Sequence, residues 1–236
     1  MSGGLELLGF GPDGWGQPLL KATGMTLAAA VCGFSLGAGF GIGGAALKLS
    51  RRGSLRGVAH IYTTLFRGVP EILVVYLFYF GGSIALTKVM NLGGFPGFFS
   101  LPSFVIGVLA IGIVSGAYQT EAFRAAFLRL DRGQMEAAAG CGMSPFLRLR
   151  RIVAPQALRF ALPALGNIWQ SALKETSLLS VIGLTELLRQ AGIAAGSTRQ
   201  PLLFYGVAAL VFLTIGKLTG QALARLERRL ARPWSR

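Results

Sequence analysis

Charged residues are scarce in this chain of 236 residues: they make up 14% of it, against about 25% of an average soluble domain. Acidic residues are fewer than basic ones: the chain has 9 aspartates and glutamates and 23 lysines and arginines. Apolar residues reach 53%, more than a soluble protein of this size can keep away from water. The composition excludes a disordered chain and predicts one integral membrane domain that fills residues 1–236.

Residues that carry catalytic or metal-binding chemistry are also few. The chain has 2 cysteines and 1 histidine, so we expect neither a structural disulfide nor a cysteine-histidine metal cluster. A phosphate-binding loop, in which two spaced glycines precede Lys and Ser or Thr, does not occur in the sequence. We therefore expect no cofactor, no metal and no enzymatic activity in this chain.

Five apolar segments approach the roughly 20 residues that a helix needs to cross hydrocarbon. They cover residues 25–47, 70–89, 101–118 (with helix that can continue to 130), 161–182 and 201–222. The first segment contains Gly33, Gly37, Gly41, Gly43 and Gly44. Such small residues let neighbouring helices pack closely in a membrane. The sequence predicts an all-α polytopic protein with about five transmembrane helices.

The basic residues gather in the connections that five spans place on one side of the membrane. Eighteen of the 23 lie within residues 48–67, 124–159 and 217–236. Because cytoplasmic segments are enriched in Lys and Arg, we expect the C-terminus in the cytoplasm and the N-terminus outside, with residues 1–20 as a periplasmic segment. Topology then explains most of the net charge of +14, and nucleic acid is not expected as a partner.

The cytoplasmic loop at residues 131–160 has the most specific pattern in the chain. Glu136–Cys141 is a strong helix former, and Gly142 can end that helix with a positive φ. Ser144 is a good N-cap for a second helix, whose first position suits Pro145. The loop is thus predicted to be two short helices with a break between them.

The second of these helices is predicted to stop at Pro155. A helix pair of this kind also resembles a helix-turn-helix DNA reader, but that motif needs a soluble three-helix core, and here membrane spans flank the pair. A basic loop that only sets the topology would not need such an ordered pair. The small-residue face of the first helix instead suits docking into a groove of another protein.

Several spaced motifs of the chain resemble one family. Glu136, Ala137, Ala138, Gly142, Ile152 and Pro155 stand at the spacing of the loop that is shared by the membrane permeases of bacterial ABC importers. Residues 62–70, 116–124 and 173–184 are similar to the polar amino acid permeases, and residues 44–50, 166–170 and 195–198 to the Q-type permease of histidine, lysine-arginine-ornithine and opine importers. One departure is Glu175, where other members carry Ser or Asp.

The resemblance implies a permease subunit of an ATP-driven importer in the bacterial inner membrane, which moves polar, basic amino acids (arginine, lysine, ornithine or histidine) or opines. It implies an ATPase dimer that holds ATP and Mg, a periplasmic amino-acid-binding protein, membrane lipid, and a second permease, either an M-type subunit or another copy. The loop would be the coupling helix that sits in the ATPase. Its coupling residues would be Glu136, Ala137, Ala138, Gly142, Ser144, Pro145 and Pro155.

Charged residues inside the fourth span are candidates for the substrate path. Lys174 and Glu175 are neighbours that do not face each other on a helix, so each needs another partner, a water-filled path or a ligand. A structural ion pair or a lysine that reaches the membrane surface is the alternative. The candidate path residues are Asn167, Gln170, Lys174, Glu175 and Ser177. In the third span, Glu121 and Arg124 stand at the spacing of a structural intrahelical pair.

A stand-alone secondary amino acid transporter is the alternative function. Such a transporter needs ion-coupling residues and is usually built from inverted repeats. The chain shows no convincing internal repeat, and five spans do not divide evenly. A neighbouring ATPase with a phosphate-binding loop would decide for the importer.

Overall fold

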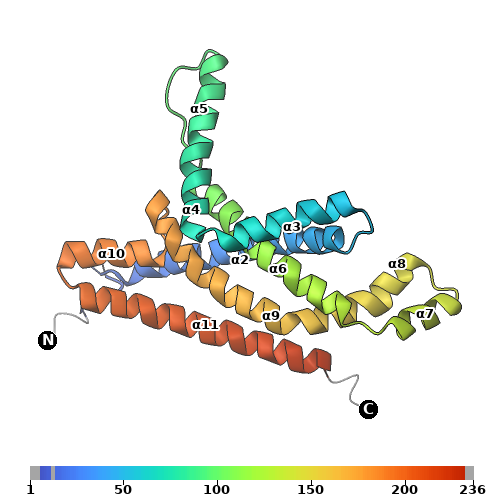
Figure 1. The fold of residues 1–236 in the computed structure, drawn as a ribbon. Helices are drawn as coiled ribbons and strands as arrows, with labels where there is room; N and C mark the ends of the chain where they lie inside the picture. Colours follow the sequence, from blue (N-terminus) through green and yellow to red (C-terminus); the bar gives the residue numbers. More distant parts are fainter. Residues whose placement is uncertain (1–5, 12–13, 232–236) are drawn as a thin grey trace.

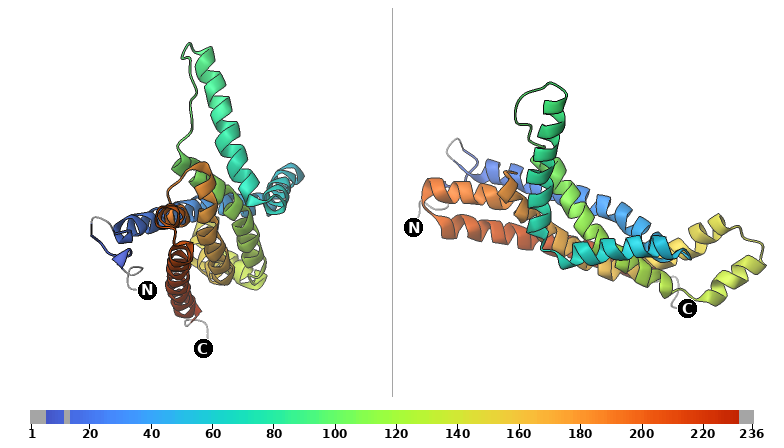
Figure 2. Two further views of the ribbon diagram at one scale, coloured as in Figure 1. Left: turned by 90° about the vertical axis from the view of Figure 1, so that its left-hand side faces the viewer. Right: turned by 45° about the horizontal axis from the view of Figure 1, so that its top comes forward.

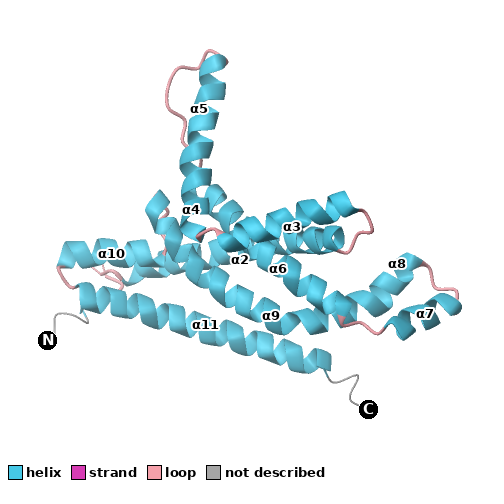
Figure 3. Cartoon of the chain, viewed as in Figure 1, coloured by secondary structure: helices cyan, strands magenta, loops and turns pink. Residues whose placement is uncertain are grey.

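The computed structural model describes residues 6–11 and 14–231, and every regular element in these ranges is helical (Figure 3). The all-α fold class predicted from the sequence is confirmed. In chain order the elements are α2 (Gly16–Lys48), α3 (Gly53–Gly68), α4 (Glu71–Tyr76), η1 (Leu77–Gly81), α5 (Gly82–Leu92), α6 (Ser103–Leu128), α7 (Arg132–Gly140), α8 (Pro145–Arg148), η2 (Leu149–Val153), α9 (Ala154–Glu175), η3 (Thr176–Ile182), α10 (Leu187–Thr198) and α11 (Pro201–Ala231). Of these, η1 and η2 are π-helical turns and η3 is a 3-10 helix.

Four helices of the described chain are long and apolar enough to cross a membrane: α2, the combined segment α4–η1–α5, α6 and α11. A fifth arises if the helix Pro145–Ile182 and α10, which meet at 53°, form one bent span. The prediction of about five spans is therefore confirmed. The first span is longer than predicted, because α2 begins at Gly16, inside the expected N-terminal segment. Its 33 residues extend about 50 Å, well beyond the hydrocarbon layer.

Helices α2 and α6 pack closely along a stripe of glycines. The stripe consists of Gly33, Gly37, Gly41 and Gly44. A Cβ atom at Gly33 would lie 2.7 Å from Ile111 Cγ2, and one at Gly41 would lie 2.7 Å from Gln119 Cβ. No ordinary van der Waals contact is that short, so glycine is needed where the two backbones approach. The predicted close packing is confirmed at these four positions, whereas Gly43 faces open space.

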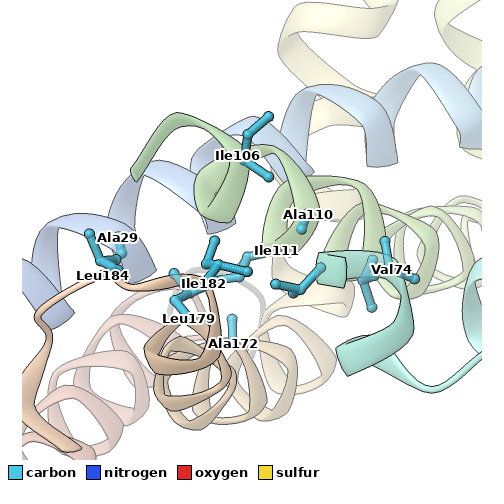
Figure 4. Packing of buried hydrophobic residues seen from close by; sticks show 11 residues of the cluster. Ala29, Val74, Ile106, Ala110, Ile111, Ala172, Leu179, Ile182 and Leu184 are labelled. Carbon is cyan, nitrogen blue, oxygen red and sulfur yellow. The ribbon is translucent and has the colours of Figure 1, made fainter. Parts of the chain in front are cut away.

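The largest apolar core of the described chain lies where α9 and η3 meet α2, α4 and α6 (Figure 4). Leu179 and Ile182 of η3 pack there against Ile111 of α6. Beside this core, Phe34 of α2 meets Trp169 of α9 edge to face, with the ring centroids 5.5 Å apart. Within a membrane such contacts stabilise the bundle through close packing rather than through escape from water. The fourth span is thus held in the centre of the bundle.

The chain bends sharply between α3 and α4. Gly68 ends α3, Val69 is extended with φ −95° and ψ 136°, and Pro70 stands directly before α4. A proline ring disfavours the helical conformation of the residue that precedes it, so Val69 breaks the helix. As a result α3 runs back along α2 and α6, while the segment α4–η1–α5 leaves the bundle and projects from it (Figures 1 and 2).

The second helix of the loop does not end where the sequence predicts. Pro155 lacks the N–H that would donate to the carbonyl of Arg151, which is why the sequence predicts a stop there. Instead α8, η2, α9 and η3 continue as one helical segment, Pro145–Ile182. The π-helical turn Leu149–Val153 ends two positions before the proline and accommodates the missing hydrogen bond. The prediction of a stop is wrong, and the loop is rigidly continuous with the fourth span.

Candidate functional site

A helical hairpin formed by α7 and α8 stands at one end of the bundle (Figure 1). In the turn between its helices, the N–H groups of Gly142 and Met143 donate to the carbonyls of Ala139 and Ala138, at 3.0 and 3.1 Å. This Schellman motif needs a left-handed residue, and Gly142 has a φ of +76°. The predicted helix break at Gly142 is confirmed.

Both helices of the hairpin begin with a side-chain cap. The hydroxyl of Ser144 accepts a hydrogen bond from the N–H of Leu147 at 3.3 Å, and Pro145 occupies the first turn, as predicted. The first helix begins earlier than predicted, because Asp131 accepts a hydrogen bond from the N–H of Gly133 at 2.8 Å and α7 starts directly after it. Each helix therefore has a defined start despite its shortness.

The Glu-Ala-Ala segment of α7 has one buried residue and two exposed ones. Glu136 and Ala137 are exposed, whereas Ala138 is buried. The side-chain amide of Gln156 at the start of α9 donates to Gln134 of α7 at 2.8 Å and braces the hairpin against the fourth span. The hairpin thus presents a small-residue surface on a braced support, which suits docking into a groove of another protein.

The polar side chains of α9 form a partly exposed face. Asn167, Ser171 and Lys174, at the three- and four-residue spacing of one helix face, are exposed. Gln170 lies at the edge of this face, and its amide donates to a backbone carbonyl of α11 at 2.9 Å. Ser177 is half-buried and donates its hydroxyl proton to the carbonyl of Lys174 at 2.7 Å. Of the predicted path residues, Asn167 and Lys174 therefore stand on the open face, whereas Gln170 bonds to the backbone of α11 and Ser177 to that of α9.

Glu175 meets a second carboxylate at a place where two helices are interrupted. It is the last residue of α9, before the helix tightens into η3, and it is half-buried. Glu71 is the first residue of α4, directly after the break at Pro70. Helix α4 packs against η3, and this packing brings the Glu71 carboxylate into the electrostatic neighbourhood of Glu175. Two adjacent carboxylates repel unless a cation or a proton lies between them, so this pair is suited to a cationic group.

Glu121 stands at the centre of an ion network that joins α2, α3 and α6. Its carboxylate accepts a hydrogen bond from the Lys48 ammonium, and Arg124 and Arg67 lie at 3.5 and 4.0 Å from it. Lys48 also donates to the hydroxyl of Thr63 at 2.6 Å. The predicted pair of Glu121 and Arg124 is confirmed, but the main partner is Lys48, from another helix.

Transport proteins resemble this chain in sequence and in fold. Residues 33–232 match the family described as binding-protein-dependent transport system inner membrane component. The chain belongs to this family of permeases. The octopine transport system permease protein OccQ of Rhizobium radiobacter is 52% identical over 96% of both chains, and the nopaline transport system permease protein NocQ of Agrobacterium fabrum is 48% identical over 95% of both. A crystal structure of an amino acid ABC transporter with histidines has a TM-score of 0.75 and 31% identity, covering 91% of this chain and 95% of that one.

This permease is a subunit of an ABC importer of the polar amino acid group, a multi-pass protein of the inner membrane. ATP hydrolysis belongs to a separate ATPase subunit, and the family implies a second permease and a binding protein as further partners. The stand-alone secondary transporter is set aside by this membership.

Two features of the site escaped prediction from the sequence. Lys48 and Glu121 are separated by 73 positions, and no local pattern joins them. Glu71 stands at the start of the second predicted span, and no sequence pattern indicates that it lies near Glu175. The cap at Asp131 did leave a signal, since Asp is a preferred N-cap residue and directly precedes the helix.

Proposed function

We propose that this permease moves opines or amino acids with a cationic side chain. The relatives named for octopine and nopaline transport support this, because both compounds are arginine derivatives with a guanidinium group. The carboxylates of Glu175 and Glu71 supply the acceptors that a guanidinium binds in a bidentate manner. Asn167, Ser171 and Lys174 continue from this pair along α9 and would bind the carboxylates of the same substrate.

The hairpin of α7 and α8 is proposed to couple the permease to its ATPase, which holds ATP and Mg. The exposed Glu136 and Ala137 would enter the ATPase cleft, while Gly142, Ser144 and Pro145 fix the turn. Movement of the cleft would then pass into the fourth span, because the helix that begins at the hairpin runs without interruption through Pro155 to the substrate path. The unbroken helix is the structural argument for this coupling.

A second permease is proposed to complete the substrate path, with an M-type subunit favoured over another copy because of the similarity to Q-type relatives. The polar face of α9 at Asn167 and Lys174 is open in the single chain. The apolar segment α4–η1–α5 projects from the bundle with few buried residues. Both surfaces are available to a facing subunit, which would enclose the path. A periplasmic binding protein would deliver the substrate to it.

The orientation is proposed from the positions of the basic residues. The connection of α2 to α3, the hairpin, and the last turns of α11 lie at the same end of the bundle (Figure 1). Each carries several arginines or lysines, which favours the cytoplasm for that end. The C-terminus would then be cytoplasmic and the N-terminus periplasmic. Of the expected periplasmic segment 1–20, residues 1–5 and 12–13 lie outside the described residues.

Uptake by the complete transporter in proteoliposomes tests the substrate path. Radiolabelled arginine and octopine would be offered with the binding protein outside and ATP at the ATPase. Glu175→Gln keeps the shape of the side chain and removes its charge. We expect the KM for both substrates to rise about tenfold, the cost of one hydrogen bond to a charged group, while the ATPase activity of the resting transporter is unchanged.

Glu6→Gln is the matched control, because it removes an exposed acid that lies outside α4 and α9. It should leave uptake at the native level. If Glu175→Gln transports arginine and octopine with a native KM, the carboxylate pair is not the substrate site. Selectivity would then belong to the binding protein alone.

A further inference from the structure

A basic cavity opens where the end of α2, the start of α3 and the second half of α6 meet. Its volume is about 500 Å³. The side chains that carry the argument are Lys48, Arg56, His60, Glu121 and Arg124, with Gly57 in the wall. One carboxylate thus faces three permanent cations and an imidazole. Its lining residues lie beside the connection of α2 to α3, at the end of the bundle that carries the basic connections.

The single carboxylate of the cavity, that of Glu121, already has cationic partners. Glu121 binds Lys48 and lies within ion-pair distance of Arg124 and Arg67. Among the described residues, no carboxylate lies within ion-pair distance of Arg56 or His60. The first turn of α3 also borders the cavity and has no side-chain cap on its N–H groups. The cavity therefore offers uncompensated cationic and N–H groups to an anion.

An apolar strip runs beside the cavity on the outer face of α3. Val58, Ile61 and Leu65 are 61%, 68% and 51% exposed. Ile61 lies one helical turn after Gly57, so the strip begins at the wall of the cavity. A free phosphate would use the basic groups alone and leave the strip uncovered. A ligand with a phosphate and a hydrocarbon chain would use both.

We propose that this cavity binds the phosphate headgroup of an anionic phospholipid, with one acyl chain along Val58, Ile61 and Leu65. Basic pockets between helices at the cytoplasmic side of a membrane are suited to such headgroups. Few residues hold α3 to the bundle, with Ala59 and Thr63 the buried ones. The lipid would therefore fasten α3 from its outer side. This inference does not depend on the proposed substrate, and it rests on the proposed cytoplasmic orientation of this end of the bundle.

Native mass spectrometry of the complete purified transporter tests the proposal. The probes are dioleoylphosphatidylglycerol, dioleoylphosphatidylcholine and inorganic phosphate, each titrated into delipidated protein. We expect the glycerol lipid to bind more tightly than the choline lipid. Arg56→Gln should weaken its binding about fivefold, the effect of one basic residue at an anionic surface. Arg150→Gln, in the basic turn η2 outside the cavity, should leave the binding unchanged.

Gly57→Leu provides a second, steric variant. A Cβ atom at Gly57 meets nothing within 4 Å, so the new side chain enters open space and should leave the fold intact. Its melting temperature and elution volume would be compared with the native transporter. We expect Gly57→Leu to reduce phosphatidylglycerol binding at least as much as Arg56→Gln.

Three results would overturn the proposal. Phosphatidylglycerol binding that is equal in Gly57→Leu and the native transporter would place the lipid elsewhere. Inorganic phosphate that binds as tightly as the lipid would assign the cavity to a free anion. Loss of subunit assembly in Arg56→Gln, with lipid binding unchanged, would assign the cavity to a protein partner.

Discussion

Helices α6 and α11 are both long and apolar, yet the rest of the chain buries most of α6 and leaves most of α11 exposed. Of the most apolar 18 residues, 61% are buried in α6 and 11% in α11. Gly107, Gly112 and Gly116 bring α6 into close contact with its neighbours, whereas α11 exposes large side chains such as Leu202, which is 91% exposed. Apolar content therefore places a helix in the membrane, but small residues mark which helices pack against each other.

The exposed helices indicate where the permease meets its surroundings. Only 17% of the most apolar 18 residues of the segment α4–η1–α5 are buried, close to the value for α11. The tightest helix contact of the described chain lies instead between α2 and α6. Lipid and partner subunits are left to cover α11 and the projecting segment. A bulky side chain placed where α6 meets α2 tests whether this tight packing stabilises the protein.

Gly37→Leu should have the largest effect on stability. A side chain at this position of α2 would collide with Ser115 and Gln119 of α6, where the helices are in direct contact. We expect a loss of 3 kcal/mol or more, at or above the upper end of the roughly 1–3 kcal/mol for overpacked cores. The melting temperature of the purified transporter measures it. Gly39→Leu is the control, because a Cβ atom at Gly39 meets nothing within 4 Å; equal melting of both variants would refute the tight interface.

The same contrast explains how far the sequence alone could lead. The glycines of the first span predict its packing, because a three- to four-residue repeat defines a helix face. The turn at Gly142 and the cap at Ser144 are equally local, and both are confirmed. The helix through Pro155 was missed, because a π-helical turn leaves no simple residue signature. The meeting of Glu71 with Glu175 was missed because it depends on the tertiary fold.

Substitutions in the ion network near the end of α6 should have the second largest effect on stability. The loss should differ between the two partners, Glu121 and Lys48. Glu121→Gln would leave the Lys48 side chain, only 8% exposed, without its carboxylate, at a cost of about 3 kcal/mol. Lys48→Met would leave Glu121 with Arg67 and Arg124 and should cost less. Thermal melting of both single variants and of the double variant measures the coupling. Equal losses for the two single variants would contradict Lys48 as the buried member of the network.

Gly142→Ala should have a smaller effect on stability and a clear effect on function. The left-handed φ of +76° at Gly142 costs about 1 kcal/mol for a residue with a Cβ atom. Because the strain would loosen the turn of the hairpin, we expect less ATP-dependent uptake with the bundle intact. Gly140→Ala lies in helical backbone with open space around it and should preserve uptake. Native uptake by Gly142→Ala would exclude the turn geometry from coupling.

The smallest effect is expected where α11 joins the bundle, and it tests the comparison of α6 and α11 from the exposed side. Gln170 of α9 donates to a carbonyl of α11 at 2.9 Å. A hydrogen bond between helices in a membrane contributes about 0.6 kcal/mol, so Gln170→Leu should lower the melting temperature only slightly. Asn167→Leu, on the exposed face one turn earlier, should leave the melting temperature unchanged. If Gln170→Leu destabilises the transporter as strongly as Gly37→Leu, then α11 depends on the chain itself as much as α6 does, and its exposed surface cannot be read as the part completed by lipid and partners.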